Sequence, residues 1–517
     1  MTIEAHRAQP SPTEQSNRDT TVRVLERLAQ SEAPALLTPG LPGPGHHLNG
    51  RGFVQRVHDI AGVLAGHGVG RGQVVALLSG PNHPDVVLGR YAVRMVGATV
   101  VHLRSMNPRT DEDELPLAAQ LDILDRTNAD VLVADAESSA RAAELADQRP
   151  ALVVISTTQV AGPAPTPTPN FSDDCAVIDL TSGTTGTPRL VRQSQAGRIE
   201  LVERLAGDLG SSPIRLLSVT PVTHTTSPMI DAVLLGGGSV VLHRGFEVDA
   251  VLDAIEAGVT DIYLATAHLG VLLDHPRTAN TDFSGLRRIV YSGTPAARHR
   301  VAAARAMFGD AIIQVYGATE TGGISALSPQ DHDEPILQGT VGQPFPWVEI
   351  SVRDPDSGES LEPGEAGAIF VRSSTMADGY WAEPEGSNRD PDGWVSTGDL
   401  GALEQHGRLR LVGRLDRVIK HGGLKIYPAT IESVLLEHPD VSEAVVHGIR
   451  DAERREFVHG VVSPRAGAEL DESALIAYVA DRLSAEHAPT RLLIWHGLPL
   501  THSGKADRQL VRDLLGQ

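Results

Sequence analysis

The chain of 517 residues is poor in cysteine, in aromatic residues and in long hydrophobic runs. Cys175 is its only cysteine, so no intrachain disulfide can form and a metal site can draw on one thiolate at most. Aromatic residues make up 4% of the chain, so aliphatic side chains and alanine must fill the cores. No run reaches the roughly 18 apolar residues of a transmembrane helix, and we expect a cytoplasmic protein that does not enter a membrane.

Positive charge is also scarce. The 44 Lys and Arg residues stand against 65 Asp and Glu residues, which gives a formal net charge of −21. Such an acidic chain repels the phosphates of nucleic acids and of anionic lipids at long range, so we expect neither as a partner. A hydrophobic fraction of 41% with 21% charged residues is typical of a soluble globular enzyme. This composition is still compatible with a small anionic ligand held by a few local groups.

Strand-like and helix-like segments alternate over most of the chain. Short apolar runs, for example at residues 74–78 and 175–180, are bounded by turn residues, and segments with helical spacing of apolar residues lie between such runs. This alternation predicts an α/β fold with parallel strands. From about residue 348, short strands with turn signals predict a small antiparallel β subdomain. We therefore predict a disordered tail at 1–20, a large N-terminal domain at 21–412 and a small mobile α+β C-terminal domain at 413–517.

The most informative stretch is DLTSGTTGTPR at residues 179–189, directly after a strand-like run. Its glycines let backbone N–H groups turn inward, its hydroxyl groups add donors and its arginine adds a cation, a combination suited to a polyphosphate. It is not a Walker motif, because the Gly-Lys-Ser/Thr ending is missing. By composition alone it also suits a flexible polar loop. The candidate phosphate-binding residues are Thr181, Ser182, Gly183, Thr184, Thr185, Gly186 and Arg189.

This loop resembles the Ser/Thr/Gly-rich signature of the adenylate-forming superfamily, which includes acyl-CoA synthetases, the adenylation domains of peptide synthetases and firefly luciferase. Further motifs of that family follow in order: YGATE at 316–320, STGD at 396–399, GRLDR at 413–417 with GGLKIYP at 422–428, and SGK at 503–505. The resemblance extends from about residue 50 to the C-terminus. It implies a ligase that uses ATP to convert a carboxylic acid into an acyl-adenylate, releases pyrophosphate and passes the acyl group to a nucleophile.

The resemblance also implies roles in nucleotide binding for the matching residues. Tyr316 offers a ring to adenine, Thr319 a hydroxyl to the α-phosphate, and Glu320 a carboxylate to Mg²⁺. Asp399 accepts the ribose hydroxyls, and Arg414 reaches the ribose or the α-phosphate. ATP and Mg²⁺ are thus the expected cofactors. The wall beside adenine is expected to consist of Ser292, Gly293 and Thr294.

Other matches imply the chemistry of the two steps. Lys505 is the expected bridge between the carboxylate and the α-phosphate, and Asp416 stands at the hinge about which the small domain rotates between the steps. His224, in the sequence PVTH, matches a Pro-x-x-His element that gates the acyl pocket of acyl-CoA synthetases. The expected catalytic residues are Lys505, His224, Thr319 and Glu320. The expected substrate-pocket residues are Met229, Asp231, His268, Ser292 and Ala318, with Asp231 offered to a polar substrate atom.

The sequence leaves several alternatives for the acceptor of the acyl group. Coenzyme A is the leading one, and an amine, which would give an amide directly, comes next. Arg189-Leu190 stands where the family normally has Lys-Gly, and Ser194 where relatives often have His, which marks a divergent member. A separate carrier protein and a non-catalytic nucleotide-binding relative are further alternatives. The acid and the oligomeric state are also open, a homodimer being one option.

Overall fold

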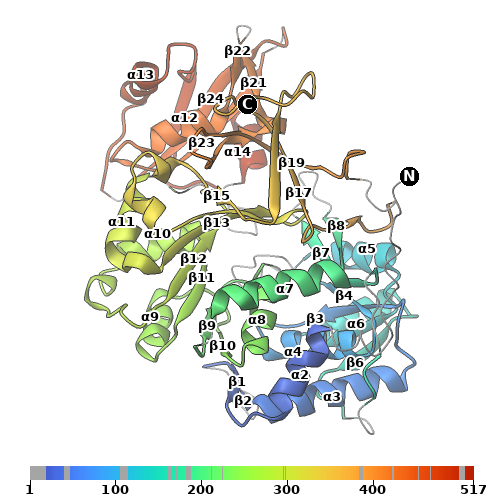
Figure 1. The fold of residues 1–517 in the computed structure, drawn as a ribbon. Coiled ribbons are helices and arrows are strands. Elements are labelled where there is room, and N and C mark those ends of the chain that lie inside the picture. Colours follow the sequence, from blue (N-terminus) through green and yellow to red (C-terminus); the bar gives the residue numbers. More distant parts are fainter. Residues whose placement is uncertain are drawn as a thin grey trace, which may run out of the picture. The chain divides into compact units, whose positions relative to one another are not determined.

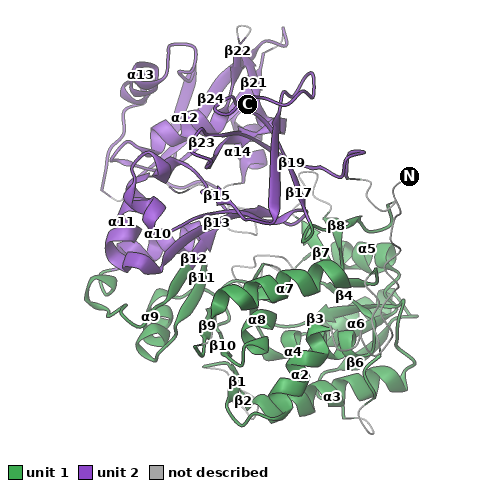
Figure 2. Ribbon diagram, viewed as in Figure 1, with its two compact units in different colours: residues 1–264, 276–289, 374–388 green, residues 265–275, 290–373, 389–517 purple. Residues whose placement is uncertain are grey.

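The computed structural model divides into two compact units, coloured separately in Figure 2 and treated one at a time below. Unit 1 comprises Met1–Leu264, Pro276–Ile289 and Ser374–Asn388, and unit 2 comprises Ala265–His275, Val290–Ser373 and Arg389–Gln517. The predicted boundary at residue 413 falls inside unit 2, and the predicted division into domains stays a prediction. The described residues are 19–39, 47–104, 115–160, 165–168, 173–181, 188–210, 212–223, 225–294, 296, 298–383, 388–421, 424–451, 453–465, 467–499 and 507–516.

Unit 1 contains a seven-stranded sheet with the strand order β18-β8-β7-β4-β3-β5-β6 (Figure 1). Strands β6, β5, β3, β4 and β7 are mutually parallel, as predicted, while β8 and β18 continue the sheet antiparallel. The strands are β3 (Val74–Leu78), β4 (Thr99–His102), β5 (Val131–Ala134), β6 (Val153–Ser156), β7 (Cys175–Thr181), β8 (Arg189–Ser194) and β18 (Gly379–Tyr380). The helices between the parallel strands are α4 (Pro84–Met95), α5 (Leu117–Thr127) and α6 (Ser139–Gln148).

A second group of strands in unit 1 follows the order β11-β9-β10-β1-β2. All of these neighbours pair in parallel except β1 and β2, which are antiparallel. The strands are β1 (Pro34–Leu37), β2 (His47–Asn49), β9 (Arg215–Ser218), β10 (Ser239–Leu242) and β11 (Asp261–Ala265). The remaining helices of unit 1 are α2 (Thr20–Ala29), α3 (Gly50–Gly66), α7 (Gln195–Leu209), α8 (Thr226–Leu235), α9 (Val248–Glu256) and the 3₁₀ turn η2 (Thr278–Asn280).

One large apolar core joins these parts of unit 1. It combines aliphatic side chains of α2, α3, α4 and α8 with those of the parallel strands, so that α4 is buried along its whole length. Helix α8 packs against α7 and α2, and α3 packs against α4 (Figure 1). A helix buried on all sides must pair every polar side chain that it carries, which becomes important for the arginines of α4 below.

The first part of unit 2 contains the strand order β12-β13-β14-β15 and a separate four-stranded antiparallel sheet, β16-β17-β19-β20. The antiparallel sheet confirms the β subdomain predicted from residue 348. The strands are β12 (Arg288–Ser292), β13 (Ile312–Ala318), β14 (Gly322–Leu327), β15 (Gln343–Pro344), β16 (Val348–Arg353), β17 (Gly367–Ser373), β19 (Val395–Leu403) and β20 (Leu409–Arg414). The helices here are α10 (Thr266–Asp274), α11 (Arg298–Phe308), η3 (Gly309–Ala311), η4 (Gln330–Asp333) and η5 (Leu337–Gly339).

The C-terminal part of unit 2 is the small α+β arrangement expected from the sequence, with an apolar core of its own. Strands β23 and β24 pair antiparallel, and β25 joins β24 in parallel. Its elements are η6 (Leu415–Arg417), β21 (Ile419–His421), β22 (Leu424–Ile426), α12 (Pro428–Leu436), β23 (Val441–Arg450), β24 (Glu456–Pro464), α13 (Glu472–Arg482), β25 (Arg491–Ile494) and α14 (Arg508–Leu515). Among the residues that the structure describes, none of the helices combines the length and hydropathy that a membrane span requires.

Candidate active site

The neck of the predicted phosphate loop lies in unit 1, where β7 and β8 form an antiparallel hairpin. Thr181 ends β7 and pairs with Arg189, which begins β8. Thr181 is half-buried, and Arg189 is exposed. The loop residues Ser182, Gly183, Thr184, Thr185 and Gly186 lie outside the described residues, so their phosphate-binding role stays a prediction. The described structure therefore places the loop's cation at its neck, directly across from Thr181.

Two further side chains contact this neck. The Arg189 guanidinium donates a hydrogen bond from Nη1 to the hydroxyl of Tyr380 at 3.2 Å, and its carbon lies 5.4 Å from the centroid of the Tyr380 ring. Arg126 of α5 donates from Nη1 to the carbonyl oxygen of Pro188 at 2.9 Å. The sequence analysis did not find Tyr380 or Arg126, because a single tyrosine and a single helical arginine carry no signal of their own.

The turn of the Pro-x-x-His element is also in unit 1, and its backbone is held from two sides. His224 itself lies outside the described residues. Two residues earlier, the N–H of Val222 donates to Oδ1 of Asn82 at 3.1 Å, and the carbonyl oxygen of Val222 accepts from Nη1 of Arg90 at 3.1 Å. Asn82 also donates to the carbonyl oxygen of Thr220 at 3.0 Å. The chain leading to His224 is thus fixed by buried side chains, while the gating role of His224 stays a prediction.

The assignment of Asp231 to the substrate pocket is wrong. Asp231 is 1% exposed on the inward face of α8. Its Oδ1 accepts from Nη2 of Arg90 at 2.8 Å and from the hydroxyl of Tyr91 at 2.9 Å. Its Oδ2 accepts from Nη2 of Arg198 at 2.8 Å and from Nη1 of Arg94 at 3.5 Å. Both oxygens are occupied by neighbours from α4 and α7, so Asp231 is the centre of a buried ion cluster and is closed to substrate.

The pKa of Asp231 also fits a buried ion cluster. Burial alone would raise the pKa of Asp231, but the positive charges of Arg90, Arg198 and Arg94 hold it well below its ordinary value. Burial also raises the pKa of Tyr91 well above its ordinary value, so this hydroxyl stays a hydrogen-bond donor. The carboxylate is therefore ionised at all physiological pH values and is fully compensated inside the core. Met229, two residues earlier on α8, is half-buried at the edge of the same core, and its place in a substrate pocket stays a prediction.

Three of the residues assigned to the nucleotide meet in unit 2. The hydroxyl of Tyr316 donates to Oδ2 of Asp399 at 2.6 Å, and Nη1 of Arg414 donates to Oδ1 of the same carboxylate at 3.2 Å. They come from β13, β19 and β20, with Asp399 and Arg414 directly opposite each other in the antiparallel pair. The Asp399 side chain is 16% exposed and that of Arg414 41% exposed. The cluster thus has a solvent-facing carboxylate held at a defined position.

The local backbone explains this geometry. Gly398 has φ of +72°, and a Cβ there would lie 2.9 Å from Nη2 of Arg414. The STGD sequence therefore needs glycine both for its left-handed conformation and for the close approach of the arginine. Burial, and then the charge of Asp399, raise the pKa of Tyr316 well above its ordinary value. The tyrosine is accordingly neutral and donates to the aspartate.

The remaining residues assigned to the nucleotide lie at the ends of β12 and β13. Helix α11 connects these neighbouring strands as a βαβ unit, so that their carboxyl ends lie at the same edge, where α/β sheets bind ligands. Ser292 ends β12 and is followed by Gly293 and Thr294. Thr266 fixes this segment by donating from Oγ1 to the carbonyl oxygens of Ser292 at 3.1 Å and Thr294 at 2.8 Å.

The end of β13 carries the other matches. Ala318 is its last residue and pairs with Gly322 across the turn that contains Thr319 and Glu320. All three side chains are half-buried, as is that of His268 on α10. Their individual roles stay predictions, and Ser292 and Ala318 end neighbouring strands of the same sheet.

Glu320 is the predicted ligand of Mg²⁺. Searched over the described ranges, the chain has no group of three or more His, Cys, Asp or Glu side chains arranged for a metal. Mg²⁺ is commonly held through one or two carboxylates together with phosphate oxygens and water, rather than by an all-protein cage. A single half-buried carboxylate next to the nucleotide-side residues fits an ion that arrives with ATP.

Two predicted elements of the second step cannot be placed. Lys505, Gly422 and Gly423 lie outside the described residues. Asp416 lies in the 3₁₀ turn Leu415–Arg417, with its side chain 49% exposed and Oδ1 3.7 Å from Nε of Arg414. A short turn between two sheets is a suitable place for a hinge. The hinge role of Asp416 stays a prediction.

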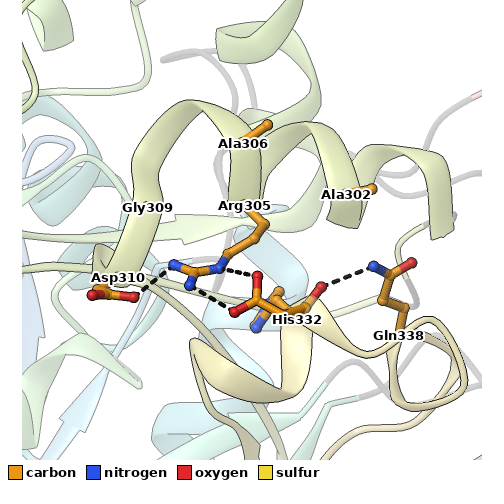
Figure 3. A pocket seen from close by; sticks show the side chains of 8 residues that line it. Ala302, Arg305, Ala306, Gly309, Asp310, His332 and Gln338 are labelled. Atoms are coloured by element: carbon orange, nitrogen blue, oxygen red, sulfur yellow. Dashed lines mark hydrogen bonds and ion pairs between the residues drawn. The ribbon is translucent and has the colours of Figure 1, made fainter.

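A pocket of about 600 Å³ lies elsewhere in unit 2, against α11 (Figure 3). Arg305 points into it and donates to both oxygens of Asp333 at 2.7 and 2.8 Å and to Asp310 at 2.8 Å. Gln338 donates to the carbonyl oxygen of His332 at 2.8 Å. The charged side chains of this pocket pair with one another, and none of the sequence-predicted residues lines it.

Comparison with known proteins decides the family. A model of AMP-binding enzymes matches residues 26–381, and a model of the AMP-binding enzyme C-terminal domain matches residues 430–505. The chain belongs to the AMP-binding enzyme family. It is therefore an acid-activating, AMP-forming ligase that uses ATP, as the resemblance implied.

Several named proteins are similar to this AMP-binding enzyme over most of its length. Feruloyl-CoA synthases from Amycolatopsis sp and Streptomyces sp are 32% identical over 468 residues, which cover 89% of this chain and 93% of theirs. Among solved structures, the amide bond synthetase McbA from Marinactinospora thermotolerans is 32% identical with a TM-score of 0.86, covering 96% of this chain and 99% of that one. The o-succinylbenzoate CoA synthetase from Bacillus subtilis, bound to its acyl-adenylate, is 27% identical with a TM-score of 0.82, covering 95% and 98%.

Proposed function

We propose that this ligase activates a carboxylic acid as an acyl-adenylate and then transfers the acyl group to coenzyme A. The observation that carries the first step is the cluster of Tyr316, Asp399 and Arg414. Its partly exposed carboxylate, aligned by a neutral tyrosine and an arginine, suits the paired hydroxyls of a ribose. We assign Ser292 and Ala318, which end neighbouring strands, to the nucleotide and acid sites.

Adenylation brings two anions together. A carboxylate oxygen attacks the α-phosphorus, and the bond from that phosphorus to the bridging oxygen breaks, so that pyrophosphate leaves with the electron pair. Catalysis then depends on holding the reactants in line and on neutralising charge. Arg189 at the loop neck and Lys505 supply positive charge from the chain, and Thr319 supplies a hydroxyl donor. Mg²⁺, when bound through Glu320 and phosphate oxygens, supplies further positive charge.

Transfer to coenzyme A requires its sulfur to attack the acyl carbon while AMP leaves and the thiol proton is released. The 32% identical feruloyl-CoA synthases, aligned over most of both chains, support this acceptor. An amine acceptor is the second candidate. It is supported by the equally identical amide bond synthetase, which aligns over 96% of this chain, and by the divergent Arg189-Leu190 pair at the phosphate loop.

The decisive experiment separates the two steps. The protein is incubated with ATP, Mg²⁺ and a panel of aryl-propenoic, indolic and aliphatic acids, and pyrophosphate release is measured. Coenzyme A or an amine is then added, and the product is identified by mass. We expect pyrophosphate with at least one acid and a thioester when coenzyme A is present.

The control variants test the residue assignment. Lys505→Ala should abolish pyrophosphate release, whereas Arg512→Ala, which removes an exposed cation on α14 seven positions later, should retain it. Absence of pyrophosphate with every acid contradicts the adenylation step. Formation of an amide but no thioester would mean that the acceptor is an amine and not coenzyme A.

A further inference from the structure

The Arg189–Tyr380 contact at the phosphate loop has a geometry that a lone surface arginine lacks. The hydroxyl of Tyr380 accepts from Nη1 of Arg189 at 3.2 Å, while the guanidinium also lies over the tyrosine ring at 5.4 Å. Both contacts restrict the same flexible side chain. An exposed arginine otherwise populates many rotamers, and part of this freedom is lost whenever it must meet a ligand.

Tyr380 is itself fixed to the strand that carries the arginine. Strand β18 pairs with β8, so that Tyr380 lies opposite Val191 and Gly379 opposite Arg192. On the far side, the N–H of Trp381 donates to the carbonyl oxygen of Leu190 at 2.7 Å. The Trp381 side chain packs against the apolar core that contains Leu190. The ring of Tyr380 therefore moves with β8 and has a defined position relative to the loop neck.

The opposite end of β18 is attached to β8 as well. Oδ2 of Asp378 accepts from the N–H of Ser194 at 2.6 Å, and the N–H of Asp378 donates to the carbonyl oxygen of Arg192 at 2.9 Å. Ser194 is the residue that stands where relatives often have His. Backbone pairing and these bonds already hold β18 in place, so the Tyr380 side chain is not required to attach the strand.

We propose that Tyr380 is a positioning residue that presents the Arg189 guanidinium to the β- and γ-phosphates of ATP. The inference rests on the proposed function. A planar guanidinium can be oriented by a ring and a hydroxyl together, whereas a lysine ammonium is a compact charge on a flexible stem. The pair thus supplies the orientation that an arginine needs where the family normally has lysine.

A double-mutant cycle tests this coupling through ATP affinity, which needs no acid substrate. The dissociation constant of ATP with Mg²⁺ is measured by calorimetry for the wild type, Tyr380→Leu, Arg189→Ala and the double variant. Tyr380→Leu should raise the dissociation constant about tenfold in the wild-type background. In the Arg189→Ala background the same change should have less than about a twofold effect, because the group that Tyr380 positions is gone.

Two further variants refine the readout. Tyr380→Phe keeps the ring and removes the hydroxyl, and it should raise the dissociation constant only about threefold; it carries the cycle if Tyr380→Leu fails to fold. Tyr478→Leu is the matched control, because Arg482 stacks over the Tyr478 ring at 3.4 Å on α13, and it should leave ATP affinity unchanged.

The outcomes separate this inference from the proposed function. Equal effects of Tyr380→Leu in both backgrounds, or a lower melting temperature with unchanged ATP affinity, overturn the positioning role. A wild type that binds ATP but releases no pyrophosphate with any acid overturns the proposed function, and the cycle still decides the role of Tyr380. A wild type that does not bind ATP overturns both.

Discussion

Two clusters of this molecule are each centred on an aspartate that accepts from a tyrosine and an arginine, but the two aspartates differ in their exposure. In unit 1, Asp231 accepts from Tyr91 and Arg90, and in unit 2, Asp399 accepts from Tyr316 and Arg414. The side chain of Asp231 is 1% exposed, whereas that of Asp399 is 16% exposed beside an arginine that is 41% exposed. Chemical type therefore does not distinguish a structural carboxylate from a candidate ligand-binding one.

The number of occupied lone pairs distinguishes them better. An ionised carboxylate offers about four acceptor positions. Asp231 accepts from four different side chains, so its capacity is filled by the protein. Among the described side chains, Asp399 accepts from Tyr316 and Arg414, which orient the group and leave acceptor capacity toward solvent. A carboxylate that is aligned but not saturated is the arrangement expected for ribose hydroxyls.

The largest effect should come from removing the buried carboxylate. Asp231→Ala leaves the charges of Arg90, Arg94 and Arg198 without their common partner inside the core. We expect the free energy of unfolding to fall by about 3 to 5 kcal/mol, measured by urea denaturation. The matched control is Asp249→Ala, because Asp249 is 70% exposed in its ion pair with Arg277, and it should cost at most about 1 kcal/mol. A loss below about 1 kcal/mol for Asp231→Ala would mean that the cluster does not depend on its central charge.

Removing the partly exposed carboxylate of Asp399 should instead affect activity. Asp399→Ala is expected to lower kcat/KM for ATP about a hundredfold, because two charged hydrogen bonds to the ribose are lost, while the melting temperature changes little. Glu349→Ala is the control on the same antiparallel sheet, where an exposed carboxylate pairs with Arg372 at 2.7 Å. Unchanged kcat/KM together with a lower melting temperature would make Asp399 a structural residue like Asp231.

The sequence assigned the residues of the second cluster to the nucleotide, whereas it did not indicate the first cluster. The spaced motifs around Tyr316, Asp399 and Arg414 are typical of one family, and the resemblance to that family implies a role in nucleotide binding for all three residues. Their convergence depends on strands from two sheets, separated by 83 residues between Tyr316 and Asp399, and local patterns contain no distance across that separation.

Asp231 was assigned wrongly for a related reason. Its partners Arg90, Arg94 and Arg198 lie on other helices, and in the sequence they look like ordinary surface charges. Only burial of the whole of α4 shows that its arginines need an internal partner. Alternation of strands and helices was sufficient to predict the α/β class, because periodicity is a local property, whereas the contacts of a buried charge are not.

The smallest expected effect is on the pH dependence of stability. It concerns His102 at the end of β4, which is influenced by Arg90 and Arg198 of the Asp231 cluster. His102 is 4% exposed, and neither ring nitrogen has a hydrogen-bond partner among the described residues. Burial, and then the charges of Arg90 and Arg198, lower its pKa to about 3. The unfolded chain binds this proton near pH 6.5, so the stability linked to neutral His102 is present above that pH and is lost as the pH falls from about 6.5 to about 3.

His102 should contribute about 1.4 kcal/mol per pH unit to the pH dependence of the free energy of unfolding, measured at pH 6, 5 and 4.5. His102→Leu should lower the slope by this amount and leave the contribution of other histidines whose pKa is lowered by burial, such as His447, whereas His67→Gln at the exposed end of α3 should retain the wild-type slope. Asp231 does not contribute in this window, because its pKa in the folded protein is lowered from an ordinary value of 3.8 and its stability is lost only at more acidic pH. Equal slopes for the wild type and His102→Leu would mean that His102 takes up its proton in the folded protein, and that the buried cluster tolerates a further positive charge.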